Sequence, residues 1–191
     1  MTTDTGPAPD TGPAPDTGPA PDARSEARIA PIPRGLTAIG AGSEAIARGT
    51  AAFVPALAAH ELAPGEMRRV TFGDLDVLIA WGSEGLVAID DRCPHMAAPL
   101  SLGRLDGCLL DCPLHSGQFD LATGHATRMP TTGGLDPEGD YHPVWSPPGK
   151  DPKPDPPGVK AEARRFTRVR LMRYYPLRVR DGTLEVAIPR G

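Results

Sequence analysis

Two short pieces of this sequence each place a cysteine and a histidine beside a proline. One piece contains Cys93 with His95, and the other contains Cys112 with His115. The chain has only three cysteines and five histidines, and two of each lie in these two pieces. Thiolate and imidazole ligands together suit zinc, copper or iron–sulfur chemistry rather than magnesium or calcium. The two pieces therefore predict a metal centre built from two loops.

The distribution of the four side chains favours one kind of metal centre. In zinc fingers, one piece of chain supplies a cysteine pair and another supplies a histidine pair. Here each piece supplies one of each, so two neighbouring loops could place both sulfurs on one side and both imidazoles on the other. A [2Fe–2S] centre with two cysteines on one iron and two histidines on the other needs this arrangement. A structural zinc site with the same ligands is the alternative.

Composition limits how much of the chain can form a core. The 191 residues include 24 prolines and 22 glycines, and only 5% are aromatic, which is typical of disordered or loop-rich chains. The segment DTGPAP occurs three times between Asp4 and Pro21 and offers almost nothing apolar to bury. We therefore expect a disordered Pro/Gly-rich arm over residues 1–50 and a folded domain over residues 51–191.

Short strand-like runs separated by turn residues dominate the folded part, and no long helical stripe is present. The clearest runs are RRVTF, DVLIAW, GLVAID, GCLLDC and GTLEVAI. They predict an all-β fold of short antiparallel strands. A Pro-rich insertion without apolar periodicity interrupts them at about residues 131–165.

Charge and hydropathy exclude several classes of partner. The net charge of −4 is too small to indicate a nucleic-acid or membrane partner, and no apolar run approaches membrane-spanning length. The first residues lack the basic and apolar regions of a secretory signal, so we expect a cytoplasmic protein. No paired carboxylates or catalytic triad stand out, so we expect no catalytic residue.

Seven arginines lie between Arg164 and Arg180, the only concentrated charge in the folded part. One interpretation is a solvated edge strand that charge keeps soluble. The other is a docking surface for an acidic partner, provided that this segment runs beside the metal centre.

The stretch from Cys93 to Pro130 resembles the Rieske family. CPH followed by CPLHSGQFDLATG is similar to the cluster loops of Rieske ferredoxins and of the Rieske domains of ring-hydroxylating oxygenases. The resemblance implies one Rieske-type [2Fe–2S] cluster, with Cys93 and Cys112 on one iron and His95 and His115 on the other. It also implies a Rieske-like antiparallel β-sandwich with a small cluster-binding subdomain at one end, formed by residues 51–191.

Two departures from other members bear on the reduction potential. Rieske proteins of the cytochrome complexes add a disulfide whose cysteines would fall at Ala98 and Leu114 here. They also carry a Ser and a Tyr that donate hydrogen bonds to the cluster sulfurs, at the positions of Gly117 and Phe119. Fewer donors destabilise the more negative, reduced cluster. The resemblance therefore implies a low potential, towards the end of the Rieske range at about −150 mV.

The Pro-rich remainder after Phe119 is too short for the separate catalytic domain of Rieske oxygenases. The resemblance thus implies a one-electron carrier, more an electron-transfer component than a catalyst. We expect a monomer that passes electrons from a flavoprotein reductase to an oxygenase. A redox-sensing or regulatory Rieske protein is the alternative function.

Overall fold

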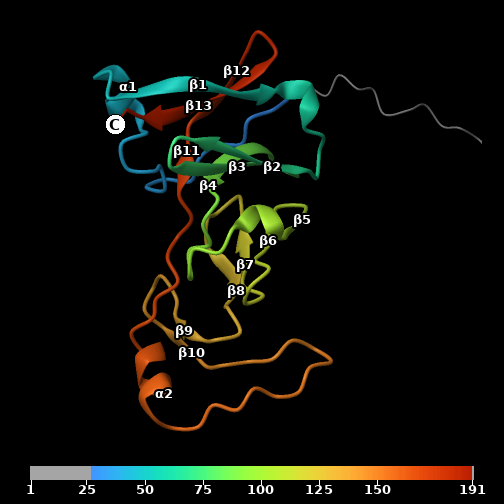
Figure 1. Cartoon of the computed structure of the whole chain (residues 1–191), viewed down its shortest axis with the longest axis vertical. Coiled ribbons are helices and arrows are strands. Elements are labelled where there is room, and N and C mark those ends of the chain that lie inside the picture. The colour runs from blue at the N-terminus through green and yellow to red at the C-terminus, as the bar shows by residue number, and fades with distance from the viewer. Residues whose placement is uncertain (1–26, 191) are drawn as a thin grey trace, which may run out of the picture.

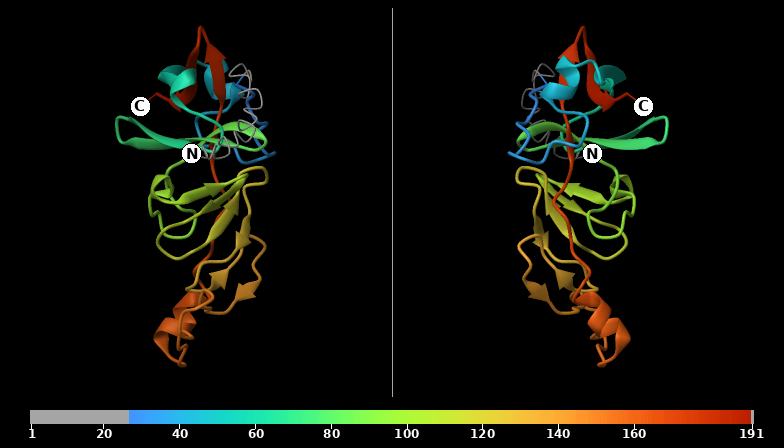
Figure 2. Two further views of the ribbon diagram at one scale, coloured as in Figure 1. Left: turned by 90° about the vertical axis from the view of Figure 1, so that its right-hand side faces the viewer. Right: turned by 90° about the vertical axis from the view of Figure 1, so that its left-hand side faces the viewer.

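The computed structural model describes residues 27–190. The three DTGPAP repeats of the predicted arm therefore lie outside the described residues. Four sheets follow one another along the long axis of the molecule, as Figure 1 and both views of Figure 2 show. Within residues 27–190 the only α-helices are two short ones, which confirms the all-β prediction.

Two antiparallel sheets form one end of the molecule. The outer sheet has the order β1-β13-β12, with β1 (Ala51–Ala58), β13 (Thr183–Pro189) and β12 (Leu177–Arg180). The middle sheet has the order β11-β4-β3-β2, with β11 (Tyr174–Tyr175), β4 (Gly85–Asp90), β3 (Leu75–Gly82) and β2 (Met67–Phe72). A 3-10 turn, η1 (Ala59–Glu61), follows β1. The runs predicted as strands within residues 68–90 are confirmed.

The strand β3, inside the middle sheet, is buried on both faces. In β3, Leu78 and Ala80 belong to the hydrophobic cluster that also contains Phe119. Val77 and Ile79 point the other way and pack in the cluster shared with the outer sheet. Successive side chains of a strand alternate between faces, so a continuous apolar run can supply two cores at once. This sheet therefore joins the sandwich to the sheet that follows it.

A third antiparallel sheet, β5-β6-β7-β8, carries the loops with the cysteines and histidines. Its strands are β5 (Arg104–Asp106), β6 (Leu109–Asp111), β7 (Gln118–Asp120) and β8 (Ala126–Arg128). The first loop runs from β4 to β5 and includes the turn η2 (Leu100–Leu102), and the second connects β6 to β7. This is the small subdomain at one end of the sandwich that the sequence predicted.

The predicted arm is wrong for residues 28–50, which pack against the sandwich. The Leu86 amide donates to the Arg28 carbonyl at 2.8 Å, and the Ala38 amide donates to the Tyr174 carbonyl at 2.7 Å. The side chains buried in this segment are all alanines, and it includes the helix α1 (Ser43–Ala47). Gly85 permits the approach, because an added Cβ would clash with the Arg28 carbonyl. Small residues and backbone bonds order this segment without an apolar pattern that sequence reasoning could detect.

The Pro-rich insertion lies beyond the third sheet, at the end opposite β1 and α1 (Figure 1). It contains the two-stranded sheet β9 (Gly134–Leu135) and β10 (Tyr141–His142), and the helix α2 (Val159–Arg164). Leu135 ties it to the returning chain, because its amide donates to the Thr167 carbonyl and its carbonyl accepts from Val169, both at 2.8 Å. In residues 27–190, no helix is long and apolar enough to cross a membrane.

Candidate metal centre

The two loops with cysteine and histidine have the same backbone form. In the first, the Cys93 amide donates to the Ala98 carbonyl, and in the second the Cys112 amide donates to the Gly117 carbonyl, both at 2.8 Å. The residue before each acceptor has a positive φ, 56° at Ala97 and 53° at Ser116. Asp181 is the only other described non-glycine residue with a positive φ. Such strained backbone persists where the surrounding structure holds it in place, often at functional sites.

The loops bring the four predicted side chains together as two pairs. Cys93 and Cys112 are each 4% exposed, and their thiols contact one another. The rings of His95 and His115 meet edge to face, with their centroids 5.0 Å apart, and both are half-buried. The sulfurs therefore face the core while the imidazoles lie nearer the solvent.

The electrostatics of the site favour metal-binding forms of these side chains. The hydrogen bond with Cys93, together with the loop amides, lowers the pKa of the Cys112 thiol to about 6, while the shared proton raises the pKa of Cys93. Burial and the neighbouring His115 lower the pKa of His95 to about 4. Burial and then the charge of Lys153 lower the pKa of His115. One thiol thus ionises readily and both imidazoles are neutral at pH 7, as ligands must be.

A third loop, from Pro130 to Gly133, closes over the pair of imidazoles. The Thr131 amide donates to the His115 carbonyl at 2.8 Å, and Thr132 Oγ1 lies 3.2 Å from His95 Nε2. Lys153 Nζ, from the Pro-rich insertion, donates to Thr131 Oγ1 at 3.1 Å. The insertion therefore reaches the site, which the sequence alone did not indicate.

A charged side chain fixes each cysteine loop by hydrogen bonds. Arg128 donates to the Ser116 carbonyl at 2.9 Å and to Asp111 at 2.7 Å, which fixes the second loop against its sheet. Asp91 is 2% exposed and accepts bonds from the Ser101 amide and hydroxyl at 2.6 and 2.7 Å, which fixes the first loop. No pattern in the sequence distinguished these supporting residues from ordinary surface charges.

The remaining predicted positions also lie at or near the site. Phe119 is fully buried in the cluster that contains Cys93 and Cys112. A Cβ added at Gly117 would lie 3.2 Å from the Pro130 ring, so this glycine allows the third loop to approach. The third cysteine, Cys108, instead contacts the Ser83 hydroxyl at 3.1 Å.

The arrangement of the four side chains suits the cofactor that the sequence predicts. Within residues 27–190, no three His, Cys, Asp or Glu side chains are grouped so that they could hold a single metal ion. A cluster with two irons needs its ligands in two separate pairs, one of thiolates and one of imidazoles. The buried thiol pair and the half-buried imidazole pair fit this requirement.

Comparisons with known proteins identify the family of this chain. The family model described as "Rieske [2Fe-2S] domain" matches residues 52–138, a range that contains both loops. The ferredoxin component of a naphthalene 1,2-dioxygenase system from Pseudomonas aeruginosa is 35% identical over 83 residues, which cover 44% of this chain and 80% of that protein. Ferredoxin CarAc from Metapseudomonas resinovorans is 37% identical over 76 residues, 39% of this chain and 71% of that protein.

Among solved structures, the ferredoxin of carbazole 1,9a-dioxygenase from Nocardioides aromaticivorans IC177 has a TM-score of 0.46 and 22% identity, with 72% of this chain and 98% of that chain covered. The sequence matches place this chain among the all-β iron–sulfur proteins. More particularly, it belongs to the Rieske [2Fe–2S] family, and its cofactor is a Rieske-type [2Fe–2S] cluster.

Proposed function

We propose that this chain carries single electrons from a flavoprotein reductase to an oxygenase. Cys93 and Cys112 hold one iron, and His95 and His115 hold the other. The observation that carries the proposal is the burial of the thiol pair behind a half-buried imidazole pair in the loops of the third sheet. The names of the relatives support the direction of transfer, because they are ferredoxin components of dioxygenase systems.

The chain's own residues have distinct tasks in this function. The cluster, when bound, supplies the one-electron redox chemistry. The apolar core around Cys93 and Cys112 keeps water from the sulfurs and fixes their spacing. The imidazoles lie nearer the solvent and give the electron a short way out of the protein. Thr132 and Thr131 hold the histidine side in position through a ring nitrogen and a backbone carbonyl.

The proposal also covers the bounds of the domain, the cellular compartment and the oligomeric state. We propose that the Rieske domain comprises the packed segment from residue 28 together with residues 51–190, with the Pro-rich insertion at about 131–165. None of the three cysteines forms a disulfide, which suits the reducing conditions of the cytoplasm. We propose a monomer there, because a carrier that serves two partners in turn needs its cluster end accessible.

Metal analysis and electron counting test this function. Protein purified without oxygen should contain two irons and two acid-labile sulfides per chain, and dithionite should bleach its visible absorption at one electron per chain. An NADH-dependent flavoprotein reductase should then reduce cytochrome c only when the chain is present. One zinc per chain without sulfide would leave the structural zinc alternative instead. A loaded cluster that no reductase reduces would contradict the carrier function while leaving the cofactor intact.

A further inference from the structure

The arginine-rich segment is divided among the outer sheet, the first cysteine loop and the insertion. Arg178 and Arg180 belong to β12 in the outer sheet, where they pair with Glu185 and Asp181. Arg164 and Arg165 contact Asp155 and Tyr141 of the insertion. Three others, Arg168, Arg170 and Arg173, lie beside the first cysteine loop. There they line a groove of about 600 Å³ together with Cys93, Pro94 and His95. Arg170 is tied directly to this loop, since its amide donates to the Pro94 carbonyl at 3.3 Å.

The groove is strongly cationic. Its exposed arginines are Arg92, Arg168, Arg170 and Arg173. Within residues 27–190 none of these forms an ion pair, whereas the arginines that support the second loop and the outer sheet do. The one acidic side chain that lines the groove, Asp90, accepts a hydrogen bond from Tyr175 at 2.7 Å. In a chain of net charge −4, these unpaired charges mark a local positive field beside His95.

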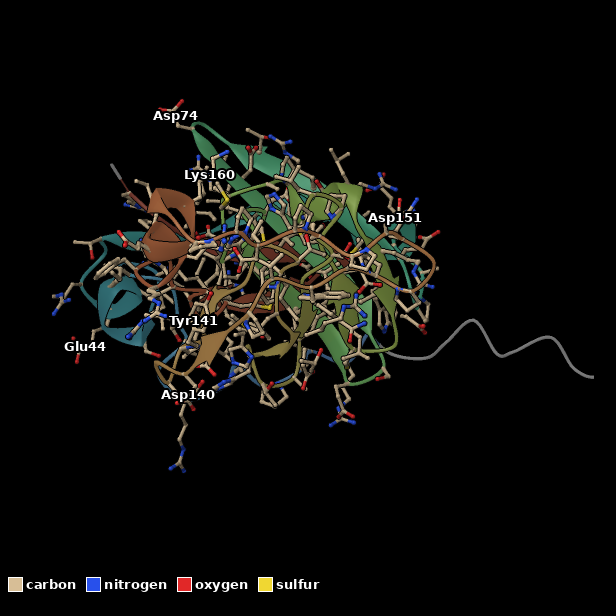
Figure 3. All side chains as sticks on the ribbon, turned by 90° about the horizontal axis from the view of Figure 1, so that it is seen from below. Glu44, Asp74, Asp140, Tyr141, Asp151 and Lys160 are labelled. Atoms are coloured by element: carbon tan, nitrogen blue, oxygen red, sulfur yellow. The ribbon has the colours of Figure 1, made fainter. Side chains whose placement is uncertain are left out.

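Large apolar side chains are exposed within this field. Met96 follows His95 and is 60% exposed, and Phe166, which also lines the groove, is 85% exposed. Two exposed acidic residues of the insertion, Asp140 and Asp151, lie at the rim of the molecule in Figure 3, which is viewed from the insertion end. Apolar anchors surrounded by charge of one sign are typical of protein docking sites.

We propose that this groove docks an acidic surface segment of the protein redox partner. The inference rests on the proposed function and names the chemistry of its partner. Carboxylates of the partner pair with Arg168, Arg170 and Arg173, while Met96 and Phe166 provide a small dry contact. The partner's redox centre is thereby brought next to His95. Such a contact forms quickly through electrostatic steering and dissociates quickly, as electron carriers require.

Charged redox probes test the sign and the place of this field. Full-length protein with its cluster is reduced and then reoxidised in a stopped-flow instrument by hexacyanoferrate(III), a trianion, or by tris(phenanthroline)cobalt(III), a trication. The near variant R168Q/R170Q/R173Q should slow the reaction with the anion by about tenfold at low salt and speed that with the cation. The far variant R48Q/R180Q/R190Q, which removes the same charge at the other end, should change neither rate more than about twofold.

A poly-L-glutamate peptide tests docking itself. It should inhibit oxidation by hexacyanoferrate(III) in the wild type and in the charge-retaining variant R168K/R170K/R173K, and not in the near variant. The proposal would be overturned if the near and far variants had equal oxidation rates with each probe. It would also be overturned if the peptide inhibited every variant equally. So would stronger binding of the peptide after deletion of residues 1–26, because the aspartates of the repeat would then be the occupant. Salt-dependent dimers lost in the near variant would point instead to a second copy.

The same data separate this inference from the proposed function. If the chain lacks a cluster or takes up no electron, the carrier function fails. If both probes oxidise every variant at one electron per chain and the near and far variants behave alike, only the docking site fails. The melting temperature of the near variant should match that of the wild type, because none of its three arginines is buried or in an ion pair among the described residues.

Discussion

Thr132 Oγ1 lies 3.2 Å from His95 Nε2, so a residue of the Pro-rich insertion contacts one of the two imidazoles. In the proposed ligand set the other ring nitrogen binds iron, so Nε2–H donates to Thr132. An acceptor at this place makes the imidazole more basic and stabilises the oxidised iron.

Thr132→Val should therefore raise the reduction potential, by on the order of tens of millivolts. Protein-film voltammetry at neutral pH measures it. Thr127→Val, which removes a hydroxyl that bonds to Gln118 on the neighbouring strand, should leave the potential unchanged. An identical potential in all three proteins would mean that Thr132 does not act on the cluster.

Replacement of one predicted ligand should remove the cluster. His115→Ala leaves three of the four side chains and opens one iron to solvent, so iron and sulfide contents should both fall towards zero. His60→Ala and His142→Ala remove histidines from a turn after β1 and from the insertion, and should keep both contents at two per chain. Full retention of iron and sulfide in His115→Ala would exclude this histidine from the ligand set.

A hydroxyl at residue 119 should raise the potential. Phe119 is fully buried in the core that contains both thiols, at the position where other Rieske proteins donate a hydrogen bond to sulfur. Phe119→Tyr would supply such a donor, which stabilises the reduced cluster. Phe53→Tyr, on β1 in the outer sheet, is the control for an added hydroxyl. A lower melting temperature without a change in potential would show an unpaired buried hydroxyl rather than a sulfur donor.

Acid should destabilise the sandwich through Asp76. Hydrogen bonds from Thr71 and then from Arg69 lower the pKa of Asp76. A group with a lowered folded pKa stabilises the protein above its unfolded pKa of about 4, and this contribution disappears as the pH falls through the folded value. Asp76→Asn should therefore make the urea midpoint depend less on pH below about 4. Asp74→Asn, in the adjacent turn, should retain the wild-type slope, and the same slope in both variants would contradict the assignment.

Two truncations should separate the repeat from the packed segment that follows it. Deletion of residues 1–26 removes a sequence with almost nothing apolar and should leave the visible spectrum and melting temperature unchanged. Deletion of residues 1–40 also removes the buried Ala30 and Ala38 and their backbone bonds to Leu86 and Tyr174. It should lower the melting temperature by several degrees, since losses of about 1 kcal/mol shift it by that amount. Equal melting temperatures would mean that the packing of residues 28–40 adds no stability.

Much of the site could be predicted because its side chains lie close together in the sequence. Cysteine and histidine are scarce in this chain, and their spacing within each loop is fixed by the turn they share. The strands from β2 to β4 were equally predictable, because short runs of β-branched and apolar residues between Gly-containing turns indicate strands.

Contacts between distant segments were not predictable in this way. The packing of residues 28–50 depends on alanines and backbone groups, which carry no periodic pattern. The support of the loops by Asp91 and Arg128 depends on which charged side chains the fold brings behind them.

The sequence by itself determined the family and the all-β class and predicted the four ligands, since each rests on residue types at short spacing. Only the tertiary structure decided that the insertion reaches His95 through Thr132, and that the arginine-rich segment is divided among the first cysteine loop, the insertion and the outer sheet. The reason is physical: local spacing fixes which groups are available, while long-range chain packing fixes which of them meet.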